Sequence, residues 1–383
     1  MSVASRNVAG ATRGSHGFRG SHGDGDPAAA GRKRATGRRG IRIGPVGIRF
    51  RPRAVLVALV LLASWTAVGA IGMFTGTLDF PHERVWATLL GEGSRIENLV
   101  LLDGRLARVA LGALVGLLLG ISGALTQTLT RNPIASPDIL GVTAGAGLFA
   151  VVVVAHPAAL SEVGIPARVG LPTAAVVGAA ATTGLILALS WRAGFDGFRL
   201  VLVGLGVNAT AIAGTSWLLT RATLEEAAIA QRWLTGSLDG AEPADLWIAA
   251  PFAVLGMVAC VRQASSLHAI RLGRELAAGL GARPPVVEAS ALAVAVVLAA
   301  AATAVAGPIG FVAFVAPQAA MRLFGTAGPP PLAAGLTGAL LVTAADLTAQ
   351  RLPVEVPVGV VTAVIGAPAL LLLLARYARR LSG

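Results

Sequence analysis

The sequence predicts an all-α polytopic membrane protein with about ten transmembrane helices, and three observations support this. Of its 383 residues, 55% are hydrophobic and only 13% are charged, whereas a soluble domain carries nearly twice that charged fraction. Apolar runs of about 20 residues, the length that crosses the hydrocarbon core of a bilayer, recur through the chain. Aromatic residues are few, while 48 glycines and abundant alanine favour close helix packing in lipid.

The chain opens with a basic segment, residues 1–53, which contains 12 of the 31 Lys and Arg residues and only two acidic residues. The segment is rich in Gly and Arg and lacks apolar periodicity. It therefore predicts a disordered cytoplasmic tail that touches anionic lipid rather than nucleic acid. A cleaved signal peptide is not expected, because the basic leader and the first apolar run are both too long. Residues 54–383 form the predicted transmembrane domain.

Ten apolar stretches are predicted to span the membrane, and the eighth is short and interrupted by proline. With the N-terminus inside, 23 basic residues fall on the inside and eight on the outside. This bias predicts a multi-pass protein of the cell membrane with cytoplasmic N- and C-termini. The predicted spans lie near residues 54–74, 105–129, 139–156, 169–190, 199–220, 245–262, 286–306, 308–324, 332–350 and 357–376.

Composition also excludes several kinds of site. Cys260 is the only cysteine, so this chain can form neither an intrachain disulfide nor a thiolate metal cluster. The five histidines are scattered without metal-ligand spacing. The only lysine, Lys33, lies outside any G-x-x-x-x-G-K-[ST] loop. We therefore expect no cofactor on this chain, and if transport is driven by ATP, then ATP and Mg²⁺ bind to another polypeptide.

The stretch from Arg105 to Gly141 carries the most distinctive pattern. Gly112, Gly116 and Gly120 recur every four residues of an apolar helix and leave a smooth stripe against which another helix can pack closely. Two prolines then break the helix, and Ser136 precedes the second of them as a predicted N-cap. The glycines alone are also typical of any tightly packed transmembrane hairpin.

As a whole, this stretch resembles the membrane permeases of iron-siderophore and vitamin B12 ABC importers, the FecCD type. The ordered motifs are Arg-Leu-x-x-Arg, Ser-Gly-Ala and Arg-Asn-Pro-x-Ala-Ser-Pro-Asp-x-Leu-Gly. The resemblance covers about residues 100–376 and implies the fold of the vitamin B12-importer permease, with 54–383 as the permease domain. The implied structural-motif residues are Arg131, Asn132, Pro133, Asp138, Gly307, Pro308, Pro317, Asp346 and Pro357.

The resemblance also implies a docking site. In this family, arginines at the Arg-Leu-x-x-Arg position dock against acidic residues of a soluble substrate-binding protein. Arg105 and Arg108 occupy that position, and Arg351 lies close to a third such position. Interfacial snorkelling, in which long basic side chains reach for the headgroups, is the alternative explanation for the arginine pair.

Residues 267–283 fall in an inside loop that predicts a short amphipathic helix ended by glycine. The segment looks like the family's coupling segment, Leu-Gly-x-x-x-Ala-x-x-Leu-Gly, which sits in a groove of the ATPase subunit. A surface helix without a partner is the alternative. The implied coupling residues are Leu272, Gly273, Arg274, Glu275, Ala277, Leu280 and Gly281, and Leu276 shares the face of Leu272 and Leu280.

Further positions concern the transport pathway. The fifth span lines the pathway in this family, so Asn208 and Thr210 are candidate lining residues. Thr143 and Ala144 correspond to the family's cytoplasmic gate region. Gln318 stands where histidine is usual, which puts in doubt any role that needs a titratable group but leaves packing and hydrogen bonding.

Asp346 is the one acid placed well inside a predicted span rather than at its edge, and such acids invite a functional interpretation. It has no obvious cationic partner in the sequence. We therefore expect a structural, hydrogen-bonding role for it.

These features together imply a permease subunit of an ATP-driven importer of ferric siderophores, and not an enzyme. The motifs Asp196-Gly-Phe-Arg199-Leu and Trp233-Leu-Thr-Gly236 look most like the ferric-enterobactin class. The implied partners are a second permease, identical or homologous, two ATP-binding subunits and an extracytoplasmic substrate-binding protein. Vitamin B12 or haem as cargo, an ion-coupled secondary transporter and a membrane enzyme are the alternatives.

Overall fold

The computed structural model of the chain describes residues 40–43, 46–49, 52–76, 78–156, 167–190, 197–354 and 356–381. The chain divides into two compact units, residues 1–51 and 52–383. In the first unit, strand β1 (Gly40–Ile43) pairs antiparallel with strand β2 (Val46–Arg49). The rest of this unit, for which disorder is predicted, lies outside the described residues.

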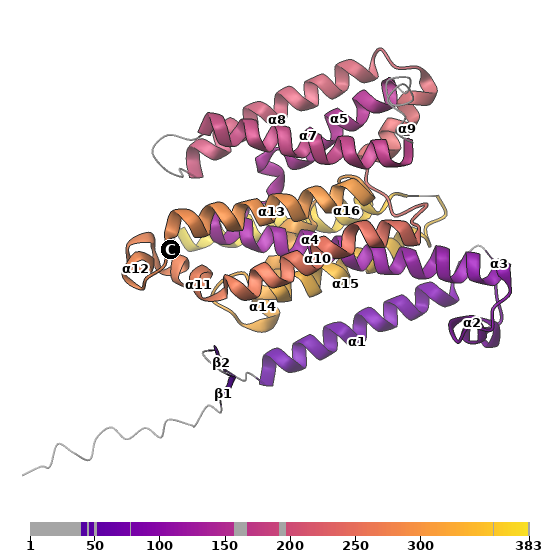
Figure 1. Cartoon of the computed structure of the whole chain (residues 1–383), viewed down its shortest axis with the longest axis horizontal. Coiled ribbons are helices and arrows are strands. Elements are labelled where there is room, and N and C mark those ends of the chain that lie inside the picture. Colours follow the sequence, from indigo (N-terminus) through magenta and orange to yellow (C-terminus); the bar gives the residue numbers. More distant parts are fainter. Residues whose placement is uncertain are drawn as a thin grey trace, which may run out of the picture. The chain divides into compact units, whose positions relative to one another are not determined.

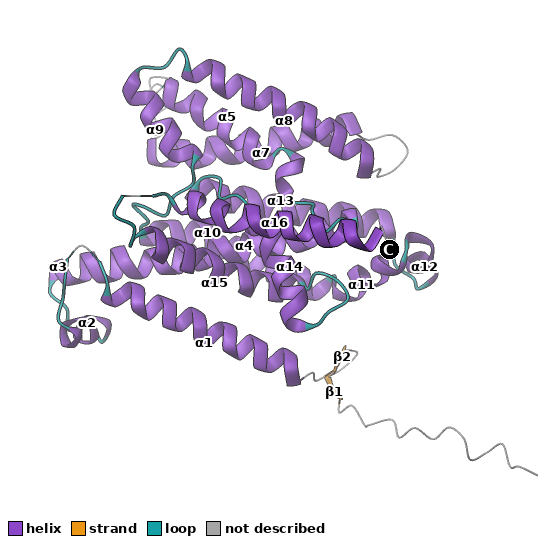
Figure 2. Ribbon diagram, turned by 180° about the vertical axis from the view of Figure 1, so that it is seen from behind, coloured by secondary structure: helices purple, strands orange, loops and turns teal. Residues whose placement is uncertain are grey.

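The second unit is a bundle of helices (Figures 1 and 2). Within the described residues, seven helices are long and apolar enough to cross a membrane, and three shorter apolar helices occupy the remaining predicted spans. The all-helical membrane fold predicted from the sequence is thus confirmed. These helices are α1 (Pro52–Phe74), α4 (Ala107–Thr130), α5 (Val142–Ala155), α7 (Ala167–Ser190), α8 (Gly197–Leu219), α10 (Pro243–Arg262), α13 (Pro284–Ala306), α14 (Val312–Phe324), α15 (Pro331–Ala349) and α16 (Val358–Leu381).

Short helices lie at both ends of the bundle (Figure 1). We call one end the Arg108 end; it carries α2 (His82–Leu89), α3 (Arg95–Glu97), the π-helix η1 (Asn98–Leu106) and α9 (Leu224–Leu234). The opposite end, called the Arg131 end, carries the 3₁₀ turn η2 (Pro137–Leu140), α11 (Ala264–Leu272) and α12 (Arg274–Gly279). Helix α3, η1 and α4 form one rod of 36 residues. At about 1.5 Å per residue, this rod is longer than the hydrocarbon core is thick, so it extends beyond the membrane.

Helix α4 is the centre of the bundle, because it contacts α10, α13, α14 and α15. Its glycine stripe is used as predicted. A Cβ atom added at Gly116 or Gly120 would collide with backbone atoms of α15, and one added at Gly123 would collide with the carbonyl group of Ala313 on α14. The close approach of these helix backbones therefore depends on the missing side chains.

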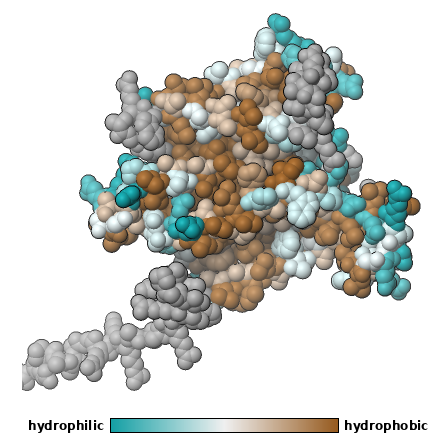
Figure 3. Space-filling view, viewed as in Figure 1, coloured by the Kyte–Doolittle hydropathy of each residue, from teal (hydrophilic) through white to brown (hydrophobic). Residues whose placement is uncertain are grey.

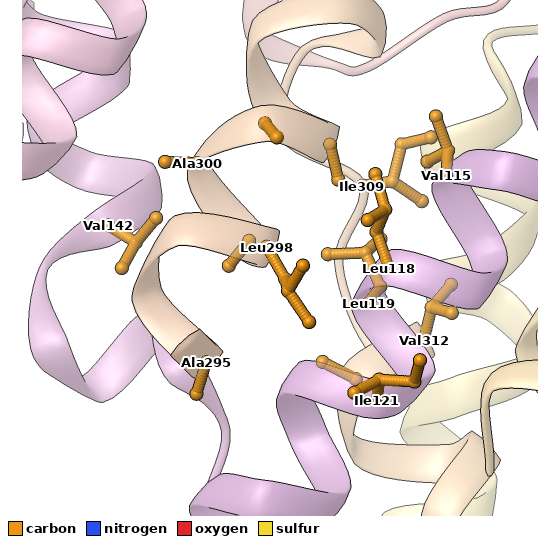
Figure 4. Close-up of a cluster of buried hydrophobic side chains, with 14 of the residues drawn as sticks. Val115, Leu118, Leu119, Ile121, Val142, Ala295, Leu298, Ala300, Ile309 and Val312 are labelled. Atoms are coloured by element: carbon orange, nitrogen blue, oxygen red, sulfur yellow. The ribbon is translucent and has the colours of Figure 1, made fainter. Parts of the chain in front are cut away.

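Apolar side chains of α4 and α13 interlock in the main hydrophobic core (Figure 4). Val115, Leu118 and Leu119 of α4 lie opposite Ala295 and Leu298 of α13 (Figure 4). By contrast, α1 packs mainly on α15 and leaves most of its side chains exposed. The outer surface is apolar across the middle of the bundle and hydrophilic towards its two ends (Figure 3). This distribution suits a lipid belt with aqueous surfaces on both sides.

A tight turn separates α13 from α14 and explains why the eighth predicted span starts late. Gly307 has φ 68° and ψ −178°, a conformation that essentially only glycine adopts. Phe311 is left-handed at φ 65°, and α14 begins at the next residue. The backbone N–H of Ser237 donates to the carbonyl oxygen of Ala306 at 2.9 Å, which ties the turn to the α9–α10 loop.

Candidate functional site

Arg108, at the start of α4, is the centre of an ion-pair network at the Arg108 end. Its Nε and Nη2 donate to the two carboxylate oxygens of Asp346 on α15, each at 2.8 Å. Its Nη1 lies 2.6 Å from Oδ1 of Asp239, in the α9–α10 loop. Gln350 also donates to Asp346, at 2.7 Å. The Asp346 side chain is only 4% exposed, so this carboxylate is buried among its donors.

This network corrects the expectation that Asp346 has no cationic partner. Its partner is Arg108, which lies 238 residues earlier in the chain and belongs to another helix. No local spacing rule connects residues so far apart. The hydrogen-bonding role expected for Asp346 agrees with the three bonds that it accepts from Arg108 and Gln350.

The two other candidate docking arginines also lie at the Arg108 end. Arg105 is half-buried; its Nη1 donates to the carbonyl oxygen of Met73 at 2.8 Å, and its Nη2 donates to that of Leu78. Arg351 is exposed, and its Nη2 lies 3.4 Å from Oγ1 of Thr75. Arg105 and Arg108 thus bind their own chain, whereas Arg351 faces solvent.

Three residues predicted for separate roles meet around the turn η2: Asp138, Thr143 and Asn208. Ser136 precedes the turn as predicted, but its hydroxyl donates to Oδ2 of Asp138 at 3.2 Å and does not cap the helix. Burial raises the pKa of the Asp138 carboxyl, against the opposing effect of hydrogen bonds from Thr143 and Ser136.

The backbone of this turn is held by side chains of two neighbouring helices. Asn208 on α8 donates through Nδ2 to the carbonyl oxygen of Asp138 at 2.9 Å. Thr183 on α7 donates to the carbonyl oxygen of Leu140 at 3.0 Å. The Oδ1 atom of Asn208 is buried and has no hydrogen-bond partner among the described residues. Asn208 therefore binds the gate-region turn.

The remaining pathway candidates are less connected. Thr210 is exposed, and its hydroxyl donates to the carbonyl oxygen of Gly206 in its own helix at 2.9 Å. Two residues along a helix correspond to a rotation of about 200°, so Thr210 faces away from Asn208. Ala144 is half-buried near the start of α5. A cavity of about 330 Å³ lies beside the turn and is lined by Thr126, Thr130, Asn132, Ala135, Ser136, Ile139, Leu140, Leu200 and Val201.

The structural-motif residues form the breaks between helices. Arg131 ends α4 in the left-handed conformation at φ 50°. Asn132 accepts a bond from the backbone N–H of Ile134 at 2.9 Å, which makes an Asx turn around Pro133. Elsewhere, Pro308 follows Gly307 in the α13–α14 turn, Pro317 lies inside α14 and Pro357 directly precedes α16.

The candidate coupling segment forms two helices where one was predicted. Gly273, at φ 121°, separates α11 from α12, and Gly281, at φ 83°, follows the second helix. Leu272, Leu276 and Leu280 are 63%, 62% and 69% exposed and form what we call the leucine ridge, whereas Ala277 between them is buried. The segment therefore lays Ala277 on the bundle and presents leucines outward.

Charged residues hold this segment on the bundle. Nη2 of Arg274 donates to the buried carboxylate of Glu288 on α13 at 2.6 Å, while Glu275 is exposed. Arg131 and Arg271 make further bonds between the segment and α4. Burial lowers the pKa of Arg271, which nevertheless stays charged at neutral pH.

Gln318, which stands where histidine is usual in the family, forms a hydrogen bond with a second amide side chain. Nε2 of Gln318 donates to Oε1 of Gln127 on α4 at 2.7 Å, and Nε2 of Gln127 donates to the carbonyl oxygen of Phe314 at 3.2 Å. Both side chains are buried. Hydrogen bonding is thus retained at this position without a titratable group.

Sequence reasoning missed Asp239 and Arg271, because each binds a partner far away in the sequence, and Glu288, whose partner Arg274 belongs to the preceding helix. It also missed the helices between the first two spans, although a signal was present. Ser94 and Glu97 form a capping box at α3, an arrangement that the pattern Ser-x-x-Glu predicts. Among the described residues, no group of three His, Cys, Asp or Glu side chains is placed to hold a metal ion.

Comparisons with known proteins agree with this arrangement. The model of the FecCD transport family matches residues 59–376. The chain is 38% identical to the ferric enterobactin transport system permease protein of Escherichia coli over 332 residues, 86% of this chain and 98% of that protein. It is 33% identical to the iron(3+)-hydroxamate import system permease protein of Bacillus subtilis, covering 85% of this chain and 97% of that one.

A solved structure shares the fold. It is described as a metal-chelate type ABC transporter in an inward-facing conformation, and it superposes with a TM-score of 0.69 at 23% sequence identity. The match covers 84% of this chain and 99% of that chain. The helical arrangement is therefore that of a known transporter structure.

Proposed function

The chain belongs to the FecCD transport family, and on that premise we propose that it translocates a ferric siderophore of the catecholate, enterobactin-like class across the cytoplasmic membrane. It is a multi-pass membrane permease subunit of an iron-chelate ABC importer and not itself an enzyme. ATP and Mg²⁺ would bind to a separate ATPase chain, and a binding protein would deliver the chelate. The complete importer would contain two permeases, identical or homologous, and two ATPase subunits.

The leucine ridge is the feature that best supports an ATP-driven mechanism. Leu272, Leu276 and Leu280 are each more than 60% exposed, and they lie on or directly after the short helices α11 and α12, which are not among the helices long enough to span a membrane. Exposed apolar groups at such a place mark a surface for a protein partner. We assign the ATPase subunit to it, because the chain has no nucleotide-binding lysine motif of its own.

The rival ion-coupled mechanism is less well supported. A secondary transporter needs ionisable or ion-coordinating groups within the membrane. Asp346 is an acid within the spanning helix α15, and its carboxylate is occupied by Arg108 and Gln350. This pairing favours a structural role for Asp346 over a role in ion coupling.

Docking of the binding protein would take place at the Arg108 end. Arg351 is exposed and can meet an acidic residue of the partner directly. Arg108 would first have to exchange Asp239, its more exposed carboxylate partner, for a carboxylate of the binding protein. Arg105 would have to release carbonyl groups of its own chain.

Access to the cytoplasm would be controlled at the turn η2. Thr143 and Ala144 follow this turn, and Asn208 holds it from α8. A shift of α8 relative to α5 would change the Asn208 contact and open or close the adjacent cavity. Thr210, on the exposed face of α8, would meet the cargo or the second permease.

Charge and topology support an orientation with both termini in the cytoplasm. Nη2 of Arg53, at the start of α1, lies 3.5 Å from the carbonyl oxygen of Arg322 near the end of α14, which would put the start of α1 at the Arg131 end. With an even number of spans the chain would return to that side, and 23 of the 31 basic residues are assigned to it, mainly because of the N-terminal segment. The ATPase surface would then be cytoplasmic, as ATP supply requires.

The choice of chelate rests on the relatives. Relatives named for the transport of ferric enterobactin, achromobactin, iron(3+)-hydroxamate and Fe(3+)-citrate are 38%, 38%, 33% and 34% identical to this chain. Three of these names specify ferric chelates, which favours an iron chelate over vitamin B12 or haem. The match to the enterobactin permease over 98% of its length supports a catecholate.

A binding experiment with matched variants tests the ATPase surface. Leu276→Glu places a charge on the leucine ridge, and Leu90→Glu makes the same change at an exposed leucine of the Arg108 end. We expect the first variant to lose the ATPase subunit on purification in detergent and the second to retain it. Equal retention of the ATPase by both variants would contradict the assignment.

A substrate panel tests the cargo. Vesicles that contain the complete importer are offered ferric enterobactin, a ferric hydroxamate, ferric citrate and cobalamin in competition. We expect ferric enterobactin to be taken up in preference to the others. Preferential uptake of cobalamin would replace the iron-chelate proposal, and preference for the hydroxamate would replace only the catecholate class.

A further inference from the structure

At the Arg131 end, two arginines cross between α4 and the candidate coupling segment. Arg131, which directly follows α4, donates through Nη2 to the carbonyl oxygen of Ile270 in α11 at 3.0 Å. The next residue of α11, Arg271, reaches back and donates through Nη2 to the hydroxyl of Thr128 in α4 at 3.2 Å. The same nitrogen donates to the carbonyl oxygen of Pro329 in the α14–α15 loop. Arg131 thus binds the backbone of α11, and Arg271 of α11 binds a side chain of α4.

The environment of Arg271 is unusual for a cation. Its acceptors in the described part of the chain are a hydroxyl and a carbonyl group, and its buried Nε has no partner there. Gly328 lies directly against the guanidinium, because a Cβ atom at that position would be 3.0 Å from Cζ. Burying a charge without a carboxylate is unfavourable, and an apolar side chain would fill this space at lower cost. Arg271 differs from an apolar side chain in that its hydrogen bonds connect α11 with α4 and with the α14–α15 loop.

The segment needs such connections because its own backbone is interrupted. Gly273 divides it into α11 and α12, and a glycine at φ 121° can act as a pivot. Beyond the pivot, Arg274 ties α12 to Glu288 of α13. Before the pivot, Arg131 and Arg271 tie α11 to α4 and to the α14–α15 loop. The leucine ridge stands on both sides of the pivot, with Leu272 in α11 and Leu276 in α12.

We propose that Arg131 and Arg271 form a crossed clamp that makes α11 move as one body with α4, so that a displacement of the leucine ridge is transmitted to the glycine-packed centre of the bundle. Both are positioning residues, since they touch neither cargo nor nucleotide. Through α4 the displacement reaches α15, which packs on it without intervening side chains at Gly116 and Gly120, and α14, which does so at Gly123. Helix α13 also contacts α4. The inference rests on the proposed function, which supplies the ATPase that displaces the ridge.

The test compares ATP hydrolysis and uptake in the same vesicles, which contain the complete importer, its binding protein and radiolabelled ferric enterobactin. The variants are Arg131→Ala, Arg271→Ala and the double substitution. Arg262→Ala is the matched control, because Arg262 is an exposed arginine at the same end, on α10. We expect hydrolysis to continue in the double variant while the amount of chelate moved per ATP falls about tenfold. The control is expected to keep the ratio of the unaltered complex.

Two further measurements separate the clamp from a general loss of structure. Arg271→Lys keeps the charge, but a lysine ammonium lacks the planar fork, so we expect a transport ratio between those of the unaltered complex and Arg271→Ala. Hydrogen exchange of the amides in residues 264–272 is expected to become faster in Arg271→Ala, with exchange in α15 unchanged. If Arg271→Ala does not assemble, Arg131→Gln is judged by the same ratio.

The outcomes are distinguishable. An unchanged ratio in the double variant, or in Arg131→Gln where Arg271→Ala does not assemble, would overturn the clamp while leaving the importer intact. If the unaltered complex shows no ATP-dependent uptake of any chelate, the proposed function itself fails.

Discussion

The two ends of α4 both carry arginines that bind their own chain, but the partners differ in charge. At the Arg108 end, Arg108 is bound by the carboxylates of Asp346 and Asp239. At the Arg131 end, Arg131 and Arg271 are bound by carbonyl and hydroxyl oxygens, which carry no net charge. We call the contacts of Arg108 with Asp346 and Asp239 the neutralised joint, because carboxylates balance the charge of the arginine. We call the contacts of Arg131 and Arg271 the uncompensated joint, because no carboxylate of the described residues takes part in them.

The two kinds of contact differ in the free energy that is needed to separate them. Separating a buried ion pair leaves a carboxylate and a guanidinium without compensation, which typically costs about 3–5 kcal/mol. Separating a guanidinium from a carbonyl group costs about 1.5–3 kcal/mol and strands no second charge. The contacts at the Arg108 end are thus the costlier ones to separate, whereas the clamp keeps α11 and α4 together through weaker bonds. The proposed docking surface lies at the first end and the proposed ATPase surface at the second.

The largest expected effect tests the neutralised joint directly. Asp346→Asn removes the buried partner of Arg108 and should lower the free energy of unfolding by about 3–5 kcal/mol, measured by denaturant titration in mixed micelles. Asp239→Asn makes the same change on the same guanidinium at a carboxylate that is 39% exposed, and should cost about 1 kcal/mol or less. Equal losses in the two variants would show that burial does not distinguish the partners.

The next effect concerns the helix that joins the two ends. Gly123→Ala places a methyl group against the carbonyl of Ala313 and should lower the free energy of unfolding by about 1–3 kcal/mol. Gly206→Ala is the control, because a Cβ atom there meets open space in the described structure. We expect this control to be neutral or slightly stabilising, since alanine favours a helix over glycine. A neutral Gly123→Ala would contradict the close contact of α4 with α14.

A smaller effect tests the uncompensated joint. Thr128→Val removes the hydroxyl acceptor of Arg271 but keeps the shape of the side chain and the bond to Pro329. We expect the free energy of unfolding to fall by about 1 kcal/mol. Thermal unfolding in detergent measures this change. A loss as large as that of Asp346→Asn would remove the contrast between the two ends.

The smallest effect is expected at an ion pair of the Arg108 end whose arginine is exposed. Arg84 donates to Glu97 at 2.6 and 2.5 Å, but its side chain is 46% exposed. Arg84→Ala should therefore lower the free energy of unfolding less than Asp346→Asn does, because solvent screens the guanidinium. The same titration as for Asp346→Asn measures it, and a cost near that of the buried pair would show that pairing rather than burial sets the energy.

The sequence was sufficient for the features that depend on local pattern. Apolar runs located the seven described helices that are long enough to span a membrane and the three shorter apolar ones, and the four-residue glycine spacing located the face of α4 that packs on α15. Ordered motifs led to the family, because they preserve chemistry at fixed spacing. The leucine spacing likewise located an amphipathic segment, although not its interruption at Gly273.

Pairings across the bundle could not be predicted in this way. Asp346 and Arg108 are 238 residues apart, and Arg271 finds Thr128 at a separation of 143 residues. Such pairs depend on which helices become neighbours, and no periodicity within a helix encodes that. The same limit explains why the bond from Asn208 to the backbone of the turn η2 could not be predicted.

The central claim is that transport by this chain is driven by ATP on a partner subunit. Its most direct test is uptake of radiolabelled ferric enterobactin into vesicles that contain the complete importer and its binding protein, with ATP enclosed or absent, and with or without a protonophore. We predict uptake that requires ATP and the ATPase subunit and that survives the protonophore. Uptake that proceeds without the ATPase and is abolished by the protonophore would contradict the account.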